Sequence, residues 1–291
     1  MQPVYARLHI LLARDARVGL VIRHGTAKSV CTLLWDRKKD KFALGQWMRG
    51  RIDTETCDLS PDGHHFVYTA QKYVNAASQS EQWTVVSRTP YLKALAYYPG
   101  RGAGGWFVNA RDYCVRGGGS GPDDRESPEV QRVESELPQP SLYAARLART
   151  GWAIEDLRAR FVRRVEFARQ AGFGWELRHH LDGGYRLSCG ELVAETRDWE
   201  WSDMDDDRLV WASQGCLWSG LMAKDGIRRI DLLHDFNGMQ FEPVAAPYRS
   251  GRPVQPRPLL QPPTSAPARK APRSMVHKKP NRSKVRPESD D

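Results

Sequence analysis

Short runs of β-branched and aromatic residues, separated by turn residues about every 10 to 14 positions, constrain the fold of this chain most strongly. In the first half the predicted strands are Tyr5–Leu12, Val18–Arg23, Ser29–Trp35, Lys41–Met48, Phe66–Ala70 and Trp83–Ser87. In the second half they are Tyr185–Ser188, Glu191–Ala194, Asp207–Ser213, Cys216–Leu221 and Ile227–Leu233. Because parallel strands need longer crossovers, this spacing predicts a mainly β fold of stacked antiparallel sheets.

Changes in composition divide the 291 residues into four parts. A stretch rich in Gly, Pro and charge at 116–140 predicts a linker or long loop between a first β half, 1–115, and a second β half, 141–248. The remainder, 249–291, is rich in proline and almost free of aromatic residues. Such a segment buries too little apolar area to offset its ordering entropy, so we expect a disordered tail.

The formal net charge of +9 lies mainly in this tail. From Pro247 to Asp291 there are eleven Lys and Arg against three Asp and Glu, which leaves the body with a charge of +1. The basic residues of 249–286 therefore predict, at most, weak salt-sensitive contact with nucleic acid or another anionic partner. No run of about 20 apolar residues predicts a membrane span, and we expect a cytoplasmic protein.

The five cysteines are scattered and never form a C-x-x-C pair. This pattern favours reduced thiols over a disulfide framework or a zinc site. Together with the absence of a P-loop pattern, it predicts no cofactor.

The segment from 143 to 177 admits two interpretations. A hairpin is predicted from Tyr143–Leu147 and Trp152–Ile154. Apolar residues at near-helical spacing then favour a single helix near 154–170, ended by Gly172. The alternative is a hairpin that pairs Val165–Phe167 with Trp175–Leu177.

The segment LSPDGHHFVY, Leu59–Tyr68, resembles the signature of TolB-type, WD-repeat-like propeller blades. In that family Pro-Asp-Gly makes a tight turn into a strand whose aromatic residue packs between blades. Asp205–Trp211 resembles a degenerate second copy without the Pro and the Gly, and Gly45–Gly63 and Val85–Pro99 are similar to parts of an uncharacterised bacterial family. Two recognisable blades are fewer than the four to eight of a closed propeller, so the resemblance implies a partial or diverged one.

The string LVIRHGT, Leu20–Thr26, resembles the first motif of the histidine phosphatases. The resemblance implies that His24 is a phosphorylated nucleophile and that Arg23 clamps phosphate oxygens, with Gly25 in the turn. The chain departs from the pattern at Lys93, where the family has an arginine, and it lacks a late Gly-His. A tight turn with solvated side chains is the simpler interpretation.

Asp203, Asp205 and Asp207 form a D-x-D-x-D run that offers hard oxygen ligands to Ca²⁺. An EF-hand loop would need Gly at its sixth position and Glu at its twelfth, where this chain has Arg208 and Gln214. Asp-rich turns before strands are common, so a β-turn is favoured over a metal site.

No complete catalytic constellation emerges from these motifs. The leading prediction is a non-enzymatic, propeller-like scaffold that binds another protein, since aromatic residues anchor protein interfaces. The alternatives are a phosphohydrolase that uses Arg23-His24-Gly25, and anion binding through the tail.

Overall fold

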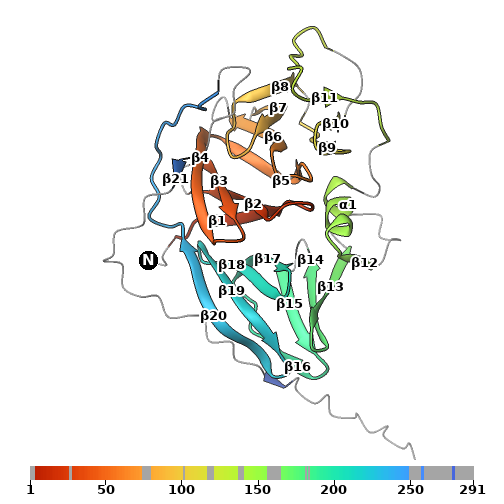
Figure 1. The fold of residues 1–291 in the computed structure, drawn as a ribbon, viewed down its shortest axis with the longest axis vertical. Helices are drawn as coiled ribbons and strands as arrows, with labels where there is room; N and C mark the ends of the chain where they lie inside the picture. The colour runs from red at the N-terminus through yellow and green to blue at the C-terminus, as the bar shows by residue number, and fades with distance from the viewer. Residues whose placement is uncertain are drawn as a thin grey trace, which may run out of the picture.

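Five sheets follow one another along the chain (Figure 1). They come from a computed structural model that describes residues 4–25, 28–73, 80–100, 102–116, 121–136, 141–155, 165–180, 182, 184–248, 257–258 and 277–278. Neighbouring strands are antiparallel except for one parallel pair, β10 and β11. The fold is therefore mainly β, as the strand pattern predicted.

The strands of the first three sheets come in chain order. Sheet A contains β1 (Arg7–Leu12), β2 (Val18–His24), β3 (Ser29–Asp36) and β4 (Lys41–Arg49). Sheet B contains β5 (Arg51–Leu59), β6 (His65–Tyr73), β7 (Ser80–Arg88) and β8 (Ala94–Pro99). Sheet C contains β9 (Gly105–Phe107), β10 (Asp112–Val115) and β11 (Gln131–Arg132). The third of these strands lies in the segment 116–140, predicted to join the halves.

A helix, α1 (Leu142–Arg149), separates these sheets from the last two. Sheet D contains β12 (Ala153–Glu155), β13 (Glu166–Gly172), β14 (Trp175–His180), β15 (Gly184–Cys189) and β16 (Leu192–Val193). Sheet E contains β17 (Trp199–Asp205), β18 (Arg208–Ser213), β19 (Cys216–Ala223) and β20 (Gly226–Asp235). Short strands β21 (Arg257–Pro258) and β22 (His277–Lys278) pair with β4 and β16.

The sheets are arranged around a centre in a propeller-like manner (Figure 1). Strand β1 contacts both β5 and β17, β5 contacts β9, and β15 contacts β17. Helix α1 contacts β5 and β12, and in Figure 1 it lies between sheets C and D. Because β1 contacts β17, sheet A and sheet E, the first and the last along the chain, are neighbours.

Four apolar cores fill the spaces between successive sheets A and B, B and C, D and E, and E and A. In the core between sheets E and A, Trp35 and Phe42 pack with Val210 and Phe236. These four side chains come from both predicted halves of the chain. The halves 1–115 and 141–248 therefore share buried apolar surface, which stabilises both.

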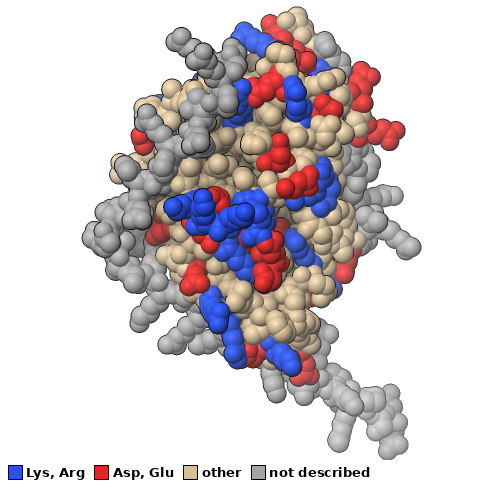
Figure 2. All heavy atoms as spheres, in the orientation of Figure 1, with Lys and Arg blue, Asp and Glu red and all other residues tan. Residues whose placement is uncertain are grey.

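Buried ion pairs join sheets A and E where the ring closes. Asp205, which is 0% exposed, accepts hydrogen bonds from Arg37 Nε at 2.8 Å and from Arg208 Nη2 at 2.7 Å. Arg208 also pairs with Asp40 at 2.7 Å, and Arg37 donates to the carbonyl of Ala13. We call this group the closing seam. Figure 2 shows basic and acidic side chains intermingled on the face of the molecule viewed in Figure 1.

The helix lies earlier in the chain than the sequence predicted. The predicted strand Tyr143–Leu147 lies within α1, which follows the N-cap Ser141, whose hydroxyl accepts from Ala144 N–H at 3.1 Å. The predicted helix near 154–170 is wrong at both of its described ends, which belong to strands β12 and β13. A β13–β14 hairpin forms, as in the alternative, but with another register: Phe167 faces His179 and Gly172 faces Trp175, instead of Val165–Phe167 facing Trp175–Leu177. The middle of the predicted helix, 156–164, lies outside the described residues, as does the predicted disordered tail except for its two short strands.

In the part of the chain that the structure describes, no helix is long and apolar enough to span a bilayer.

Candidate functional site

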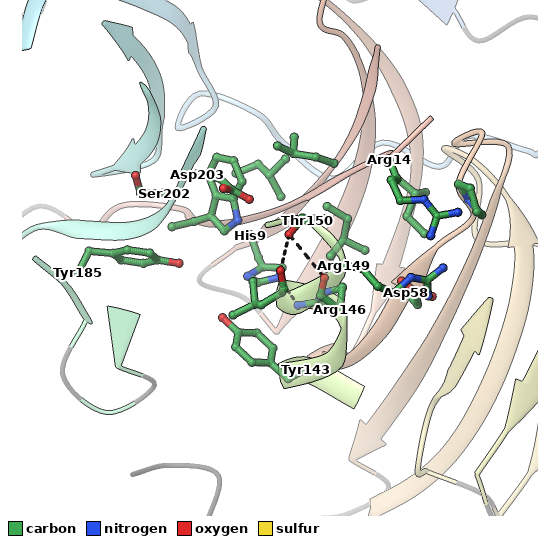
Figure 3. Close-up of a pocket in the computed structure, with 17 residues that line it drawn as sticks. His9, Arg14, Asp58, Tyr143, Arg146, Arg149, Thr150, Tyr185, Ser202 and Asp203 are labelled. Carbon is green, nitrogen blue, oxygen red and sulfur yellow. Dashed lines mark hydrogen bonds and ion pairs between the residues drawn. The ribbon is translucent and has the colours of Figure 1, made fainter. Parts of the chain in front are cut away.

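A cavity of about 40 Å³ lies at the centre of the ring (Figure 3). Its walls come from β1, the end of β5, α1, β15 and β17. The polar side chains that line it are those of His9, Arg14, Asp58, Tyr143, Arg146, Arg149, Thr150, Tyr185, Ser202 and Asp203. One water needs roughly 10–15 Å³ of such space, so the cavity has room for only a few small groups.

Helix α1 supplies much of the polar lining. Tyr143, Arg146 and Arg149 are spaced by three residues, which places them near one face of the helix. The helix ends at Arg149, and the hydroxyl of its C-cap residue Thr150 donates to the carbonyl of Leu147 at 3.0 Å. Both arginines lie in the last turn, where the helix dipole favours positive charge.

Arg146 is the most enclosed cation of the cavity, with 8% of its surface exposed. Its Nη1 donates to the carbonyls of Thr54, at 3.0 Å, and Cys57, at 2.5 Å. Its Nη2 lies 3.2 Å from His9 Nε2, and its guanidinium lies 5.0 Å from the ring centre of Tyr143. No carboxylate among the described residues pairs with it.

Burial keeps two histidines near the cavity neutral: His9, which contacts Arg146, and His179, which packs against Tyr143 and Tyr185. Burial lowers the pKa of His9 well below 6.5, and the nearby positive charge of Arg146 lowers it further. Burial also lowers the pKa of His179 to about 4. His179 Nε2 lies 2.8 Å from the Tyr143 hydroxyl, and its ring stacks on Tyr185 at 4.3 Å between centres. The aromatic side of the cavity, formed by Tyr143 and Tyr185, therefore has no charged histidine beside it at neutral pH.

Asp58 lies across the cavity from this wall and is also buried (Figure 3). Burial raises its pKa to about 6, although Arg149 and the Phe107 N–H oppose this rise. Its Oδ2 accepts from Phe107 N at 2.8 Å and lies 3.6 Å from Arg149 Nη1. Arg149 stacks over Trp106 at 3.9 Å, which fixes the position of its charge.

Asp203 closes the cavity from β17 and has partners of its own. Arg169 Nη1 contacts Asp203 Oδ1 in an ion pair, and Trp152 Nε1 donates to the same oxygen at 3.1 Å. Burial raises the pKa of this carboxyl. Its charge is therefore matched by an arginine that does not line the cavity.

The three aspartates predicted as metal ligands are not brought together by the structure. Asp203 lies at the cavity, Asp205 lies in the closing seam, and Asp207 is exposed in the turn after β17. Within the described ranges no group of three or more His, Cys, Asp or Glu side chains has the arrangement of a metal site.

The residues of the phosphatase-like motif make structural contacts. Arg23 is 5% exposed, and it donates to the carbonyls of Phe236, at 2.8 Å, and Met239, at 3.2 Å. His24 Nε2 lies 3.2 Å from the Ile52 carbonyl, and burial lowers its pKa. Neither residue lines the central cavity. The arrangement joins β2 to neighbouring segments, and phosphatase chemistry at this point stays a prediction.

Sequence reasoning missed the cavity residues on α1. The signal for them was present, because Ser141 precedes a run of Leu, Ala and Arg that favours a helix. His9 and Asp58 carry no such local signal, since each lies in a strand that holds other polar residues, and nothing in the strand's own pattern marks it out.

No protein-family model, no curated protein and no solved structure matches the chain. A small cavity with converging donors and acceptors can hold one small polar group.

Proposed function

We propose that the protein is a non-enzymatic scaffold that binds another protein, with Phe173 as an anchor of the interface. Phe173 lies at the tip of the β13–β14 hairpin and is 62% exposed. Exposed large apolar side chains elsewhere on the described surface belong to different segments, namely Val4, Val108, Leu221, Leu232 and Phe241. Phe173 is the most exposed aromatic residue among them.

The backbone of Phe173 is the observation that carries this proposal. Its φ is +53°, and that of Gly174 is +80°. Two-residue turns with both φ values positive favour Asn-Gly, because few other side chains tolerate the left-handed region. A phenylalanine there costs about 1 kcal/mol relative to a residue suited to it. A strained, exposed aromatic side chain supports a role in binding rather than in stability.

The test replaces Phe173 with the residue that the turn prefers. Phe173→Asn is expected to raise the free energy of unfolding by about 1 kcal/mol while it removes the anchor. The matched control is Gln214→Asn in the β18–β19 turn, where φ is +52° and Gly215 follows. Full-length protein would be used as bait in extracts of its native host, and captured partners would be quantified by mass spectrometry.

A partner captured by the wild type and by Gln214→Asn, and reduced at least tenfold by Phe173→Asn, would support the proposal. Equal capture by all three proteins, or no partner at all, would contradict it. The free energy of unfolding of each variant is measured as well. Because Phe173→Asn is expected to be more stable than the wild type, weaker capture by this variant could not be explained by unfolding.

The predicted contact of 249–286 with nucleic acid lies outside the described residues, apart from the backbone pairs of β21 and β22. It stays a prediction, tested by comparing the retention of the full chain on heparin with that of a chain ending at Tyr248.

A further inference from the structure

We propose that the central cavity binds one small carboxylate, held by the side chain of Arg146. Phe173, proposed above to bind a protein partner, lies on a hairpin that does not line this cavity, so the two proposed sites are separate.

Arg146 lines the cavity and has more N–H donors than hydrogen-bond partners. A guanidinium carries five N–H groups. Three donor contacts of Arg146 have partners, namely Thr54 O, Cys57 O and His9 Nε2. The Nε–H and the second N–H of Nη2 have no hydrogen-bond partner in the described part of the chain. Arginine binds carboxylates through two parallel N–H groups, which is the chemistry these donors offer.

The charges around the cavity leave one positive charge unmatched. Arg14 pairs with Asp15 at 2.9 Å, and Arg149 lies 3.6 Å from Asp58. On the other side Arg169 pairs with Asp203. Only Arg146, among these described cations, has backbone carbonyls and an aromatic ring instead of a carboxylate. A buried cation without a counter-charge is costly, so an anion at this point would be stabilising.

The same charges favour a monoanion over a dianion. Asp58 and Asp203 line the same cavity, and they would repel a second negative charge. A cavity of about 40 Å³ accommodates a carboxylate group with few other atoms. Formate or acetate fits this description, whereas phosphate is both larger and more highly charged.

Arg23 provides a matched control within the same chain. It is also buried, and its guanidinium lies 5.3 Å from the Trp47 ring centre while it donates to carbonyls. It does not line the cavity. Substitution of either arginine removes a buried guanidinium, but only one of the two faces the proposed ligand.

The experiment titrates the full-length protein with ¹³C-labelled acetate at constant ionic strength, with chloride as the balancing anion. Saturation-transfer NMR detects weak binding directly. We expect a saturable signal in the wild type and in Arg23→Met, and a signal at least tenfold weaker in Arg146→Met. Equal binding by the wild type and a folded Arg146→Met protein would overturn the proposal, as would no binding to the wild type. Binding of phosphate but not acetate would overturn the carboxylate assignment.

A second measurement decides the matter if Arg146→Met does not fold. In wild-type protein labelled with ¹⁵N-arginine, acetate is expected to shift one buried Nε–H resonance in a saturable manner. If the shifting resonance is absent from the spectrum of Arg146→Lys, it belongs to Arg146. A titration in which no Nε–H resonance shifts, or in which the shifting resonance survives in Arg146→Lys, would contradict the proposal.

Discussion

The arginines of the closing seam and Arg146 at the central cavity have different kinds of partner. In the closing seam, Arg37 and Arg208 both donate to Asp205, so full charges are matched by full charges. At the central cavity, Arg146 is equally enclosed but donates to the carbonyls of Thr54 and Cys57. The arginines of the closing seam form ion pairs that join two sheets. Arg146 has no such pair, and some of its donors are still available for a ligand.

The largest effect is expected in the closing seam. Asp205→Ala removes the carboxylate that Arg17, Arg37 and Arg208 share. It leaves the buried Arg37 without a counter-charge, and should lower the free energy of unfolding by about 3–5 kcal/mol. The double variant Arg37→Met with Asp205→Leu should be less destabilised than the sum of the single variants, because it leaves fewer charges buried alone. Urea unfolding of the wild type, Asp205→Ala, Arg37→Met, Asp205→Leu and the double variant checks both statements. Additive effects would show that the pair is not coupled.

The second largest effect is expected on the pH dependence of the free energy of unfolding, through the titration of Asp58. Its pKa of about 6 in the folded protein exceeds the value of about 3.9 expected for an unfolded chain. The folded state therefore binds this proton more tightly, and the associated stability is fully present below about pH 4 and is lost as pH rises through 6. The loss amounts to about 3 kcal/mol at most.

Asp58→Asn should remove this dependence. The measurement is the difference in unfolding free energy between wild type and variant from pH 4 to pH 8, and we expect the wild type to become relatively less stable as pH rises. A difference that stays constant, or that changes in the opposite direction, would show that Asp58 is not titrating in this range.

A smaller effect is expected at Arg146. Arg146→Met leaves two carbonyls without a donor but no carboxylate without a cation, so it should cost about 2 kcal/mol, less than Asp205→Ala. Urea unfolding of the two variants under identical conditions measures this order directly. If Arg146→Met lost more stability than Asp205→Ala, the proposed difference between the closing seam and the cavity would be wrong.

The smallest effect is expected at Arg14, whose pair with Asp15 is exposed to solvent. Arg14→Ala should leave the urea midpoint unchanged, because exposed ion pairs contribute little. A measurable loss of stability would indicate that Arg14 belongs to the buried network of the cavity.

Much of the fold was predictable, because strand and turn signals are local. The runs at Val18–Arg23, Ser29–Trp35 and Lys41–Met48 agree with β2, β3 and β4 within a few residues. Helix α1 was predicted as a strand, since a short run such as Tyr143–Leu147 has too few residues for its period to be distinguished. The cavity was not predicted at all. Its lining comes from five elements, and no local pattern indicates which of them meet.

The sequence by itself determined that the chain forms short antiparallel strands, that its body has almost no net charge, and where most turns occur. These properties depend on neighbours along the chain. Only the tertiary structure decided that Arg37 meets Asp205, 168 positions away, and that Arg146 meets the backbone of Thr54, 92 positions away. The reason is physical: the strength of an ionic contact depends on distance and burial, and both are set by which sheets become neighbours when the ring closes.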